Sequence, residues 1–203
     1  MTPARRKTVL VTGFSPFPGA PLNPTERLMH RLAKRLGDHQ CGVRFMFEVL
    51  PTTWAGRNEV TARLRREVRP DAIVHFGVDG SRRTLNIETR AVNQAVRVRP
   101  DATGQAPLRP ELDPSAERAR TATLPAEALR RAAAGSGVPV RLSRNAGTYL
   151  CNATLWDSIG SGIPSIFVHV PALPRGRRDT RPSLALIEEA ALRIVKETAR
   201  RLR

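Results

Sequence analysis

Short apolar runs alternate along the chain with longer stretches in which apolar residues recur every three or four positions. Residues 8–12 form a β-branched apolar run that ends at Gly13, which is typical of a buried strand followed by a tight loop. Asn23 can cap a helix that begins at Pro24, so we expect a helix from there to about Leu36. The same patterns predict strands at 43–50, 72–76, 138–142 and 165–170, and helices at about 54–68, 125–134, 151–159 and from 184 onward.

One stretch, about residues 97–125, departs from this alternation. It combines frequent proline with few apolar residues, which disfavours regular packed elements, so we expect an ordered excursion or a mobile loop. Elsewhere, strands that alternate with helices predict an α/β fold whose sheet is parallel in part. With 203 residues and no internal repeat, the chain is expected to form one domain, residues 1–203.

The charge balance is strongly basic. The chain carries 34 Lys and Arg against 18 Asp and Glu, a formal net charge of +16, which ordinarily indicates a nucleic-acid partner. However, 31 of the 34 basic residues are arginines spread over the whole chain, and aromatic residues, on which bases could stack, are only 4%. We therefore do not expect nucleic acid as the partner. We interpret the high arginine content as a compositional bias of the source genome.

Cysteine usage and hydropathy exclude several classes of protein. Cys41 and Cys151 are too far apart in sequence to form a Cys-x-x-Cys redox pair or a zinc cluster. No apolar run approaches the ~20 residues of a membrane span, and the first one is too short for a signal peptide. We expect a cytoplasmic protein with neither a disulfide framework nor a metal, and place Cys41 in or beside a core strand.

Cys151 is the first candidate for chemistry, because it lies where a loop leads into a predicted helix. The positive end of a helix dipole and the free amides of its first turn favour a thiolate. The same amides could hold the oxyanion of a tetrahedral intermediate. A cysteine that packs as a small apolar side chain is the alternative interpretation.

Two histidines, His75 and His169, lie on predicted strands. His169 is near the C-terminal end of its strand, the edge at which α/β sheets place their ligands, so it is a candidate base. A histidine within an apolar strand is more often a hydrogen-bonded core residue, and this alternative stands for both. His30 and His39 belong to a helix face and a loop, and we expect them in solvent.

Glu88 is an acidic residue in the alternating apolar stretch 85–89. A buried carboxylate needs a partner, and a histidine that it orients would complete a Cys-His-Glu arrangement of the kind that acyl transfer uses. The alternative is an acid on an edge strand that faces water.

Four stretches together resemble one family. Residues 9–19 (VLVTGFSPFPG), followed by Asn23-Pro24, are similar to the N-terminal signature of pyroglutamyl peptidase I, also called pyrrolidone-carboxylate peptidase. Residues 87–93 (IETRAVN) resemble its glutamate motif, residues 146–152 (AGTYLCN) its nucleophile motif and residues 167–171 (FVHVP) its histidine motif. The four stretches occur in the family's order and span most of the chain.

This resemblance implies a cytosolic cysteine peptidase that removes an N-terminal pyroglutamyl residue from peptides, needs no cofactor and commonly forms a homo-oligomer. It implies a single-domain three-layer α/β/α sandwich with a mixed, largely parallel central sheet. Carried over to the matching positions, Cys151 is the nucleophile, His169 is its base and later the acid, and Glu88 orients His169.

The resemblance also implies a binding slot for the lactam ring. Phe14 and Phe17 are expected to line this apolar slot, and Tyr149 and Leu150 to close it.

The chain departs from the family pattern around these motifs. Where the family often has Asp-Ala-Arg-Ile-Pro-Asp, residues 96–101 read Val-Arg-Val-Arg-Pro-Asp, so Val96 and Val98 replace an acid and an arginine. Ser81 replaces a glycine and Arg144 a serine. One alternative is therefore a homologue with the same triad that acts on another small lactam or an N-acyl amide. A basic nucleic-acid-binding protein on an inactive peptidase scaffold is another.

Overall fold

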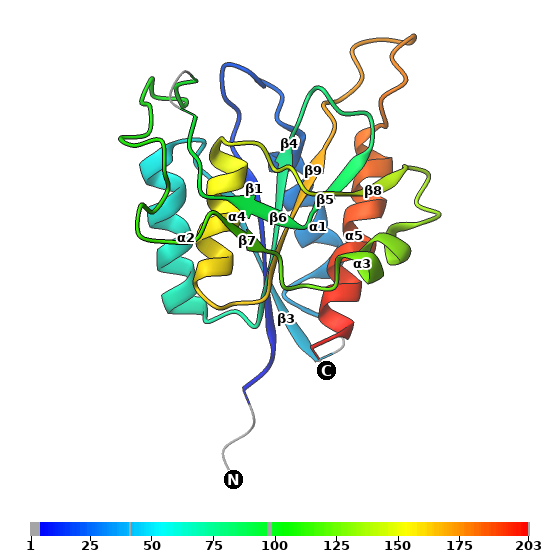
Figure 1. Ribbon diagram of the computed structural model, residues 1–203. Helices are drawn as coiled ribbons and strands as arrows, with labels where there is room; N and C mark the ends of the chain where they lie inside the picture. The colour runs from blue at the N-terminus through cyan, green and yellow to red at the C-terminus, as the bar shows by residue number, and fades with distance from the viewer. Residues whose placement is uncertain (1–4, 41, 97–98, 203) are drawn as a thin grey trace.

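The computed structural model describes residues 5–40, 42–96 and 99–202, which form three layers with a sheet in the middle (Figure 1). Within these residues the main sheet has seven strands, in the spatial order β2 (His39–Gln40), β3 (Val43–Leu50), β1 (Thr8–Phe14), β4 (Ala72–Val78), β9 (Ser165–Val170), β5 (Leu85–Glu88) and β8 (Val140–Ser143).

The directions of these strands make the sheet mixed and largely parallel, as expected. Strands β3, β1, β4 and β9 are parallel to one another. Strands β5 and β8 are parallel to each other, but β5 is antiparallel to β9, and β2 is antiparallel to β3. The central strands β1, β4 and β9 are almost entirely buried, because helices cover both of their faces.

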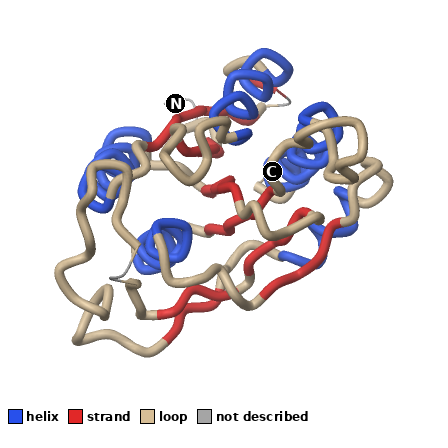
Figure 2. Tube along the Cα trace, turned by 90° about the horizontal axis from the view of Figure 1, so that it is seen from above, coloured by secondary structure: helices blue, strands red, loops and turns tan. Residues whose placement is uncertain are grey.

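Helices lie on both sides of the sheet, as the view from above shows (Figure 2). Helices α1 (Pro24–Leu36), α3 (Ala126–Ala133) and α5 (Leu184–Arg200) pack on one face, and α2 (Trp54–Val68) and α4 (Leu150–Gly160) on the other. A large apolar core lies under α1, α3 and α5, and smaller ones lie under α2 and α4. This arrangement confirms the three-layer α/β/α sandwich.

Local capping explains where several helices begin. Asn23 Oδ1 accepts a hydrogen bond from Thr25 N (3.1 Å) at the start of α1, as its sequence predicts. Thr53 caps α2 by accepting from Gly56 N (3.1 Å), and Ser183 caps α5 in the same way. By contrast, Tyr149 at the N-cap of α4 makes no such side-chain bond, so the first turn of α4 keeps backbone amides free for other partners.

Three strands were not expected from the sequence: β2, β6 (Arg90–Val92) and β7 (Ala119–Thr121). Strands β6 and β7 form a separate antiparallel ribbon beside α4. Since β7 lies inside the stretch 97–125, the prediction that this stretch holds no regular element is wrong at its C-terminal end. The prediction for His39 is also wrong in part: it is exposed, but it lies in β2 and not in a loop.

Hydrogen bonds from a residue outside the Pro-rich stretch explain why the described part of the stretch is ordered. Asn93 Nδ2 donates to the carbonyl of Asp113 (2.6 Å), Asp113 N donates to Asn93 Oδ1 (2.9 Å), and Asn93 N donates to Arg118 O (2.9 Å). Its described part is therefore an ordered excursion. Sequence periodicity misses such a segment because long-range polar contacts hold it, with little apolar burial of its own.

Candidate active site

The C-terminal ends of β4 and β9 and the N-terminal end of α4 meet at one edge of the sheet. Gly77 of β4 and His169 of β9 are neighbours across the two strands, and Cys151 is the second residue of α4. A Cβ atom at Gly77 would lie 3.0 Å from Cys151 Sγ and 2.6 Å from Phe167 Cζ. The missing side chain at Gly77 therefore gives the sulfur its place against the sheet.

Glu88 and His169 form a buried pair on the same face. In the antiparallel pairing of β5 with β9, Glu88 lies opposite Phe167, so His169 is its diagonal neighbour. His169 Nδ1 donates to Glu88 Oε1 over 2.9 Å, and the two residues are 4% and 0% exposed. Since Nδ1 is engaged by Glu88, Nε2 is the ring nitrogen left for Cys151.

Opposing effects act on the charge of His169. Burial disfavours the charged ring, but the neighbouring sulfur of Cys151 and the carboxylate of Glu88 favour it and together raise the pKa of His169 to about 9. His169 is therefore an imidazolium at neutral pH, paired with a carboxylate on one side and facing the sulfur on the other. Such a ring can give its proton to a leaving group.

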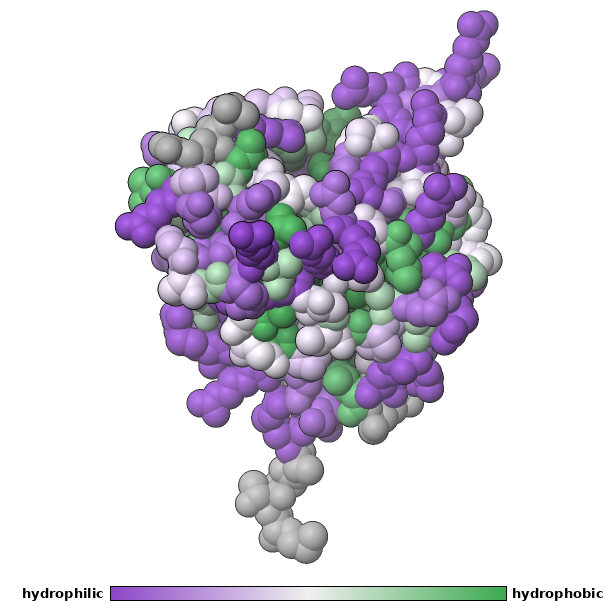
Figure 3. All heavy atoms as spheres, viewed as in Figure 1, coloured by the Kyte–Doolittle hydropathy of each residue, from purple (hydrophilic) through white to green (hydrophobic). Residues whose placement is uncertain are grey.

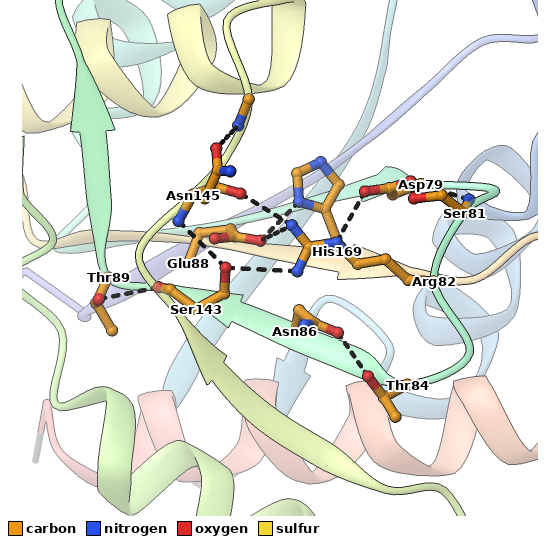
Figure 4. A network of polar contacts seen from close by, with 11 residues as sticks. Asp79, Ser81, Arg82, Thr84, Asn86, Glu88, Thr89, Ser143, Asn145 and His169 are labelled. Carbon is orange, nitrogen blue, oxygen red and sulfur yellow. Dashed lines mark hydrogen bonds and ion pairs between the residues drawn. The ribbon is translucent and has the colours of Figure 1, made fainter.

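A network of polar contacts also reaches Glu88, at the same carboxylate oxygen that His169 contacts (Figure 4). Arg82 Nη2 lies 3.2 Å from Glu88 Oε1 and donates to the backbone oxygen of Asn145 (2.9 Å). Arg82 Nε donates to Asp79 Oδ2 (2.8 Å), and Asp79 Oδ1 accepts from the amide (3.0 Å) and the hydroxyl (2.6 Å) of Ser81. Ser81, a departure from the family pattern, thus helps to fix Arg82.

His75 is not part of this site. Its ring is fully buried and hydrogen-bonded to Thr12 Oγ1 (2.7 Å) and Ser158 Oγ (2.8 Å). Burial, and secondarily the charges of Arg65 and Arg57, lower the pKa of His75 to about 3. His75 is the hydrogen-bonded core histidine that was one of the two interpretations of its position.

A cavity of about 1020 Å³ opens beside Cys151 and His169. Its lining includes all four residues expected to form the slot, which are Phe14, Phe17, Tyr149 and Leu150. Three of the four motifs that carry the resemblance therefore line one cavity, and the fourth reaches it through the contact of Glu88 with His169.

Tyr149 is fixed by contacts on three sides. Its hydroxyl donates to Pro100 O (2.9 Å), and its ring meets that of Trp54 edge to face with centroids 5.5 Å apart. The guanidinium carbon of Arg99 lies 4.8 Å from the Tyr149 ring centre and 6.0 Å from that of Phe17. Arg99 is thus an additional cationic residue of the slot wall.

The other positions at which the chain departs from the family pattern differ in whether they line the cavity. Val96 lines it, and its amide donates to Thr148 O (2.8 Å). Arg144 is exposed and does not line the cavity. Val98 and Cys41 lie outside the described residues, so the expectations for them stay untested.

Sequence reasoning assigned no role to Gly77, Arg82, Arg99 or Asn152, which help to build the site. Asn152 is fully buried and bonds through its amide to both the N–H and the C=O of Val92 (each 2.8 Å), which ties α4 to the segment after Glu88. Its position next to Cys151 in the nucleophile motif was the available signal. Arg82 offered only its place after Asp79 in a loop, because its contacts with Glu88 and Asn145 depend on the tertiary fold.

The described residues lack the features of two other kinds of site. No group of three or more His, Cys, Asp or Glu within them is arranged to hold a metal ion. No helix in the same residues has both the length and the hydropathy that a membrane crossing requires.

Comparisons with known proteins agree with this geometry. The profile of the pyroglutamyl peptidase family matches residues 7–201. The pyrrolidone-carboxylate peptidase of Pyrococcus furiosus is 33% identical in an alignment of 205 positions that takes in 94% of this chain and 97% of that protein. The corresponding protein of Pseudomonas fluorescens is 32% identical and covers 89% of this chain and 86% of its own.

Solved structures of pyrrolidone carboxyl peptidases have the same fold as this chain. A single-substitution variant of the P. furiosus pyrrolidone carboxyl peptidase has a TM-score of 0.84 at 31% identity, with 97% of this chain and 100% of that one covered. The pyrrolidone carboxyl peptidase of Thermococcus litoralis has a TM-score of 0.84 at 29% identity, with 97% and 94% covered. The chain therefore belongs to the pyroglutamyl peptidase family.

Proposed function

We propose that this protein hydrolyses the amide bond after an N-terminal pyroglutamyl residue, with Cys151 as nucleophile, His169 as acid and base, and Glu88 as the residue that orients His169. The observation that carries the proposal is the buried His169–Glu88 pair facing a cysteine in the first turn of α4, at the wall of a cavity. This combination has the parts that acyl transfer needs: a thiolate, a proton donor and free backbone amides.

The reaction begins when the Cys151 thiolate attacks the pyroglutamyl carbonyl carbon and the carbonyl electron pair moves onto its oxygen. Backbone amides in the first turn of α4, which have no partners within the helix, stabilise that oxyanion. The oxyanion then collapses, the carbon–nitrogen bond breaks, and His169 gives its proton to the leaving amine.

A thioester between Cys151 and the pyroglutamyl group remains after the peptide leaves. Water then attacks this thioester while His169, now neutral, accepts a proton from it, and collapse of the second oxyanion releases pyroglutamate and the thiolate. The imidazolium is regenerated in the same step, so the cycle balances.

The lining of the slot supports a neutral lactam ring as the acyl group. Asp79 is the one carboxylate among the described residues that line the cavity, and Ser81 and Arg82 already occupy it. An unmodified N-terminal proline or glutamate would bring a charged ammonium group into a slot walled by Phe14 and Phe17. Losing its hydration there without a carboxylate partner costs several kcal/mol, so such substrates are refused.

One observation favours a second candidate within the same chemistry. Val96 stands in the cavity wall where the family often has an acid, and the guanidinium of Arg99 lies against the rings of Phe17 and Tyr149. An acyl group other than pyroglutamyl, such as a related small lactam or an N-acyl amide, would fit a wall altered in this way.

We also propose that the enzyme acts in the cytoplasm as a homo-oligomer, as the family resemblance implies. A reducing compartment keeps a catalytic thiol available, which supports the location. Light scattering on the purified protein measures the oligomeric state, and a monomer at micromolar concentration would contradict this part of the proposal.

A substrate panel with a common chromogenic amine tests the proposed reaction. Pyroglutamyl amide is expected to be cleaved, whereas prolyl and glutamyl amides are not, and a lactam one methylene larger is disfavoured by only ~1–3 kcal/mol. Preference for the larger lactam or an N-acyl amide would favour the second candidate. Equal cleavage of prolyl and pyroglutamyl amides would refute the slot as described.

A further inference from the structure

The cavity beside Cys151 has two chemically different ends. One end is the apolar slot of Phe14, Phe17, Tyr149 and Leu150. At the other end the lining continues from His169 through Ala172, Leu173 and Pro174 to Arg175 and Arg181, with Asp79 and Gly80 beside them. The loop after β9 thus carries the cavity wall from the site towards a cluster of arginines.

The proposed reaction fixes which part of the substrate lies at each end. The acyl group stays on Cys151 in the slot, while the leaving amine must receive its proton from His169. The residues that follow the pyroglutamyl group therefore leave along the His169 side, over Ala172 and Gly80 towards Arg175. This step rests on the proposed function.

The loop at this end is basic and projects from the molecule. In the ribbon it is the orange segment that rises above α5 (Figure 1), and the surface at the same place is hydrophilic (Figure 3). Residues 175–181 hold Arg175, Arg177, Arg178 and Arg181 against the single acid Asp179.

Asp179 is already neutralised within the loop. It accepts hydrogen bonds from Arg181 Nε (3.0 Å to each carboxylate oxygen) and from the amide of Arg175 (2.9 Å). The side chains of Arg175 and Arg178, in contrast, have no ion-pair partner within the described residues. Arg175 lines the cavity, so its charge is available to an anion that enters there, and Arg178 follows three residues later in the same loop.

A second, smaller pocket of about 210 Å³ adjoins this end of the cavity. Gly80, Arg82 and Arg181 belong to both linings, and the smaller pocket adds Ser81, Arg83, Arg178 and Asp179. Arg83 is anchored by a hydrogen bond to Thr180 Oγ1 (2.7 Å), which ties the loop after β4 to the arginine loop. Four arginines and one occupied acid therefore surround a hollow next to the path of the leaving peptide.

We infer that Arg175 and Arg178 form a carboxylate-binding subsite for the leaving peptide, so that the enzyme prefers pyroglutamyl peptides with a carboxylate one or two residues after the scissile bond. That carboxylate comes either from an aspartate or glutamate side chain or from the free C-terminus of a di- or tripeptide. Guanidinium groups pair with carboxylates through charge-assisted hydrogen bonds, which gives the subsite its selectivity.

Matched peptide pairs separate the two sources of the carboxylate. Pyroglutamyl-alanine amide is compared with pyroglutamyl-alanine free acid, and pyroglutamyl-asparagine amide with pyroglutamyl-aspartate amide. In at least one pair the charged member is expected to have a kcat/KM higher by roughly threefold to tenfold, and the pair that responds identifies the source. The preference should shrink as salt is raised from about 0.02 to 0.5 M, because the subsite is open to solvent.

Loop variants locate the effect. Arg175→Gln and Arg178→Gln are each expected to reduce the charged-to-neutral ratio of kcat/KM, and the double variant to bring it close to one. Arg177→Gln is the matched control, because Arg177 lies in the same loop but in neither lining. Each variant serves as its own reference, since only the ratio within a peptide pair is compared.

The outcomes distinguish this inference from the proposed function. If the amide peptides are cleaved but neither pair shows a preference, or if the preference survives in the double variant, the subsite is refuted while the peptidase stands. A ratio that falls equally in Arg177→Gln also refutes it, because a diffuse positive field would then suffice. If none of the pyroglutamyl peptides is cleaved, the proposed function itself has failed.

Discussion

Two buried histidines on adjacent parallel strands differ in charge at neutral pH: His75 of β4 is neutral, and His169 of β9 is cationic. Both face α4, and the ring of Phe167 lies between them, with ring centres 6.0 Å from His75 and 4.9 Å from His169. The hydrogen-bond partners of the His75 ring within the described residues are hydroxyl groups, and burial together with nearby arginines lowers its pKa to about 3. His169 is almost as buried, yet its pKa is raised to about 9.

Burial alone therefore does not decide the charge of a histidine. Each ring loses about the same hydration, but Cys151 and Glu88 favour the charged form of His169, whereas the arginine charges that act on His75 disfavour its charged form. The two histidines face different parts of α4. His169 lies near Cys151 at the N-terminal end of the helix, whereas His75 is bonded to Ser158, two turns further along.

The largest effect on activity is expected when the Cys151 sulfur is removed. Cys151→Ala is expected to lower kcat/KM for a pyroglutamyl amide by about 10⁴-fold, because the proposed nucleophile is lost and His169 loses a partner that raises its pKa. An alkylating reagent should also inactivate the unmodified enzyme by labelling Cys151 faster than Cys41. Equal labelling of the two cysteines with activity retained would rule out Cys151 as the nucleophile.

Removal of the other anionic partner should have the next largest effect. Glu88→Gln keeps the shape of the side chain but not its charge, so it is expected to lower kcat by roughly 10²- to 10³-fold. His169 must be protonated to act as the acid, and its pKa falls when a neighbouring negative charge is lost. The alkaline decline of kcat, expected near pH 9 in the unmodified enzyme, should therefore move to lower pH.

The matched control for this variant is Glu127→Gln, on the exposed face of α3. It removes the same charge at a distance from the site and should leave the pH profile unchanged. An alkaline limb that stays in place in Glu88→Gln would contradict the orienting role of Glu88.

At His75 the expected effect is on stability. His75→Leu leaves the buried hydroxyls of Thr12 and Ser158 without their partner, which should cost about 1–3 kcal/mol in the free energy of unfolding. Urea denaturation measures this loss. Activity per folded molecule should stay nearly constant, and a large loss of kcat would mean that His75 takes part in the reaction.

The low pKa of His75 also predicts a dependence of stability on pH. Between about pH 6.5 and pH 3 the unfolded chain binds a proton at this position and the folded chain does not. The free energy of unfolding should therefore fall as the pH is lowered through this range, by up to ~1.4 kcal/mol per pH unit from this group. His75→Leu should remove that part of the slope, whereas replacement of the exposed His30 should not.

The smallest expected effect concerns the slot. Phe17→Ala removes part of the apolar wall but touches neither histidine, so it is expected to raise KM about fivefold with a lesser change in kcat. The rate at which Cys151 is alkylated should be unchanged. A slower alkylation would show that Phe17 also supports the sulfur.

Local elements were largely predictable, because periodicity and capping act over a few residues. Helix α2 was expected at 54–68 and is found there, and the start of α1 at Pro24 follows from its Asn23 cap. The ribbon of β6 and β7 was not predictable, because each strand has three residues and is held by contacts such as those of Asn152 and Asn93.

Sequence patterns predicted the helices and the longer strands of the sheet, and the motifs identified Glu88, Cys151 and His169 as candidates, but the short strands β2, β6 and β7 were not predicted. Only the tertiary structure decided that β5 enters the sheet antiparallel to β9, which brings Glu88 diagonally next to His169. It also decided that Arg82 reaches Glu88, that Gly77 makes room for the sulfur, and that one buried histidine is charged and the other neutral. The physical reason is range: propensity and capping act between near neighbours in sequence, whereas strand pairing, desolvation and charge pairing depend on residues that only the folded chain brings together.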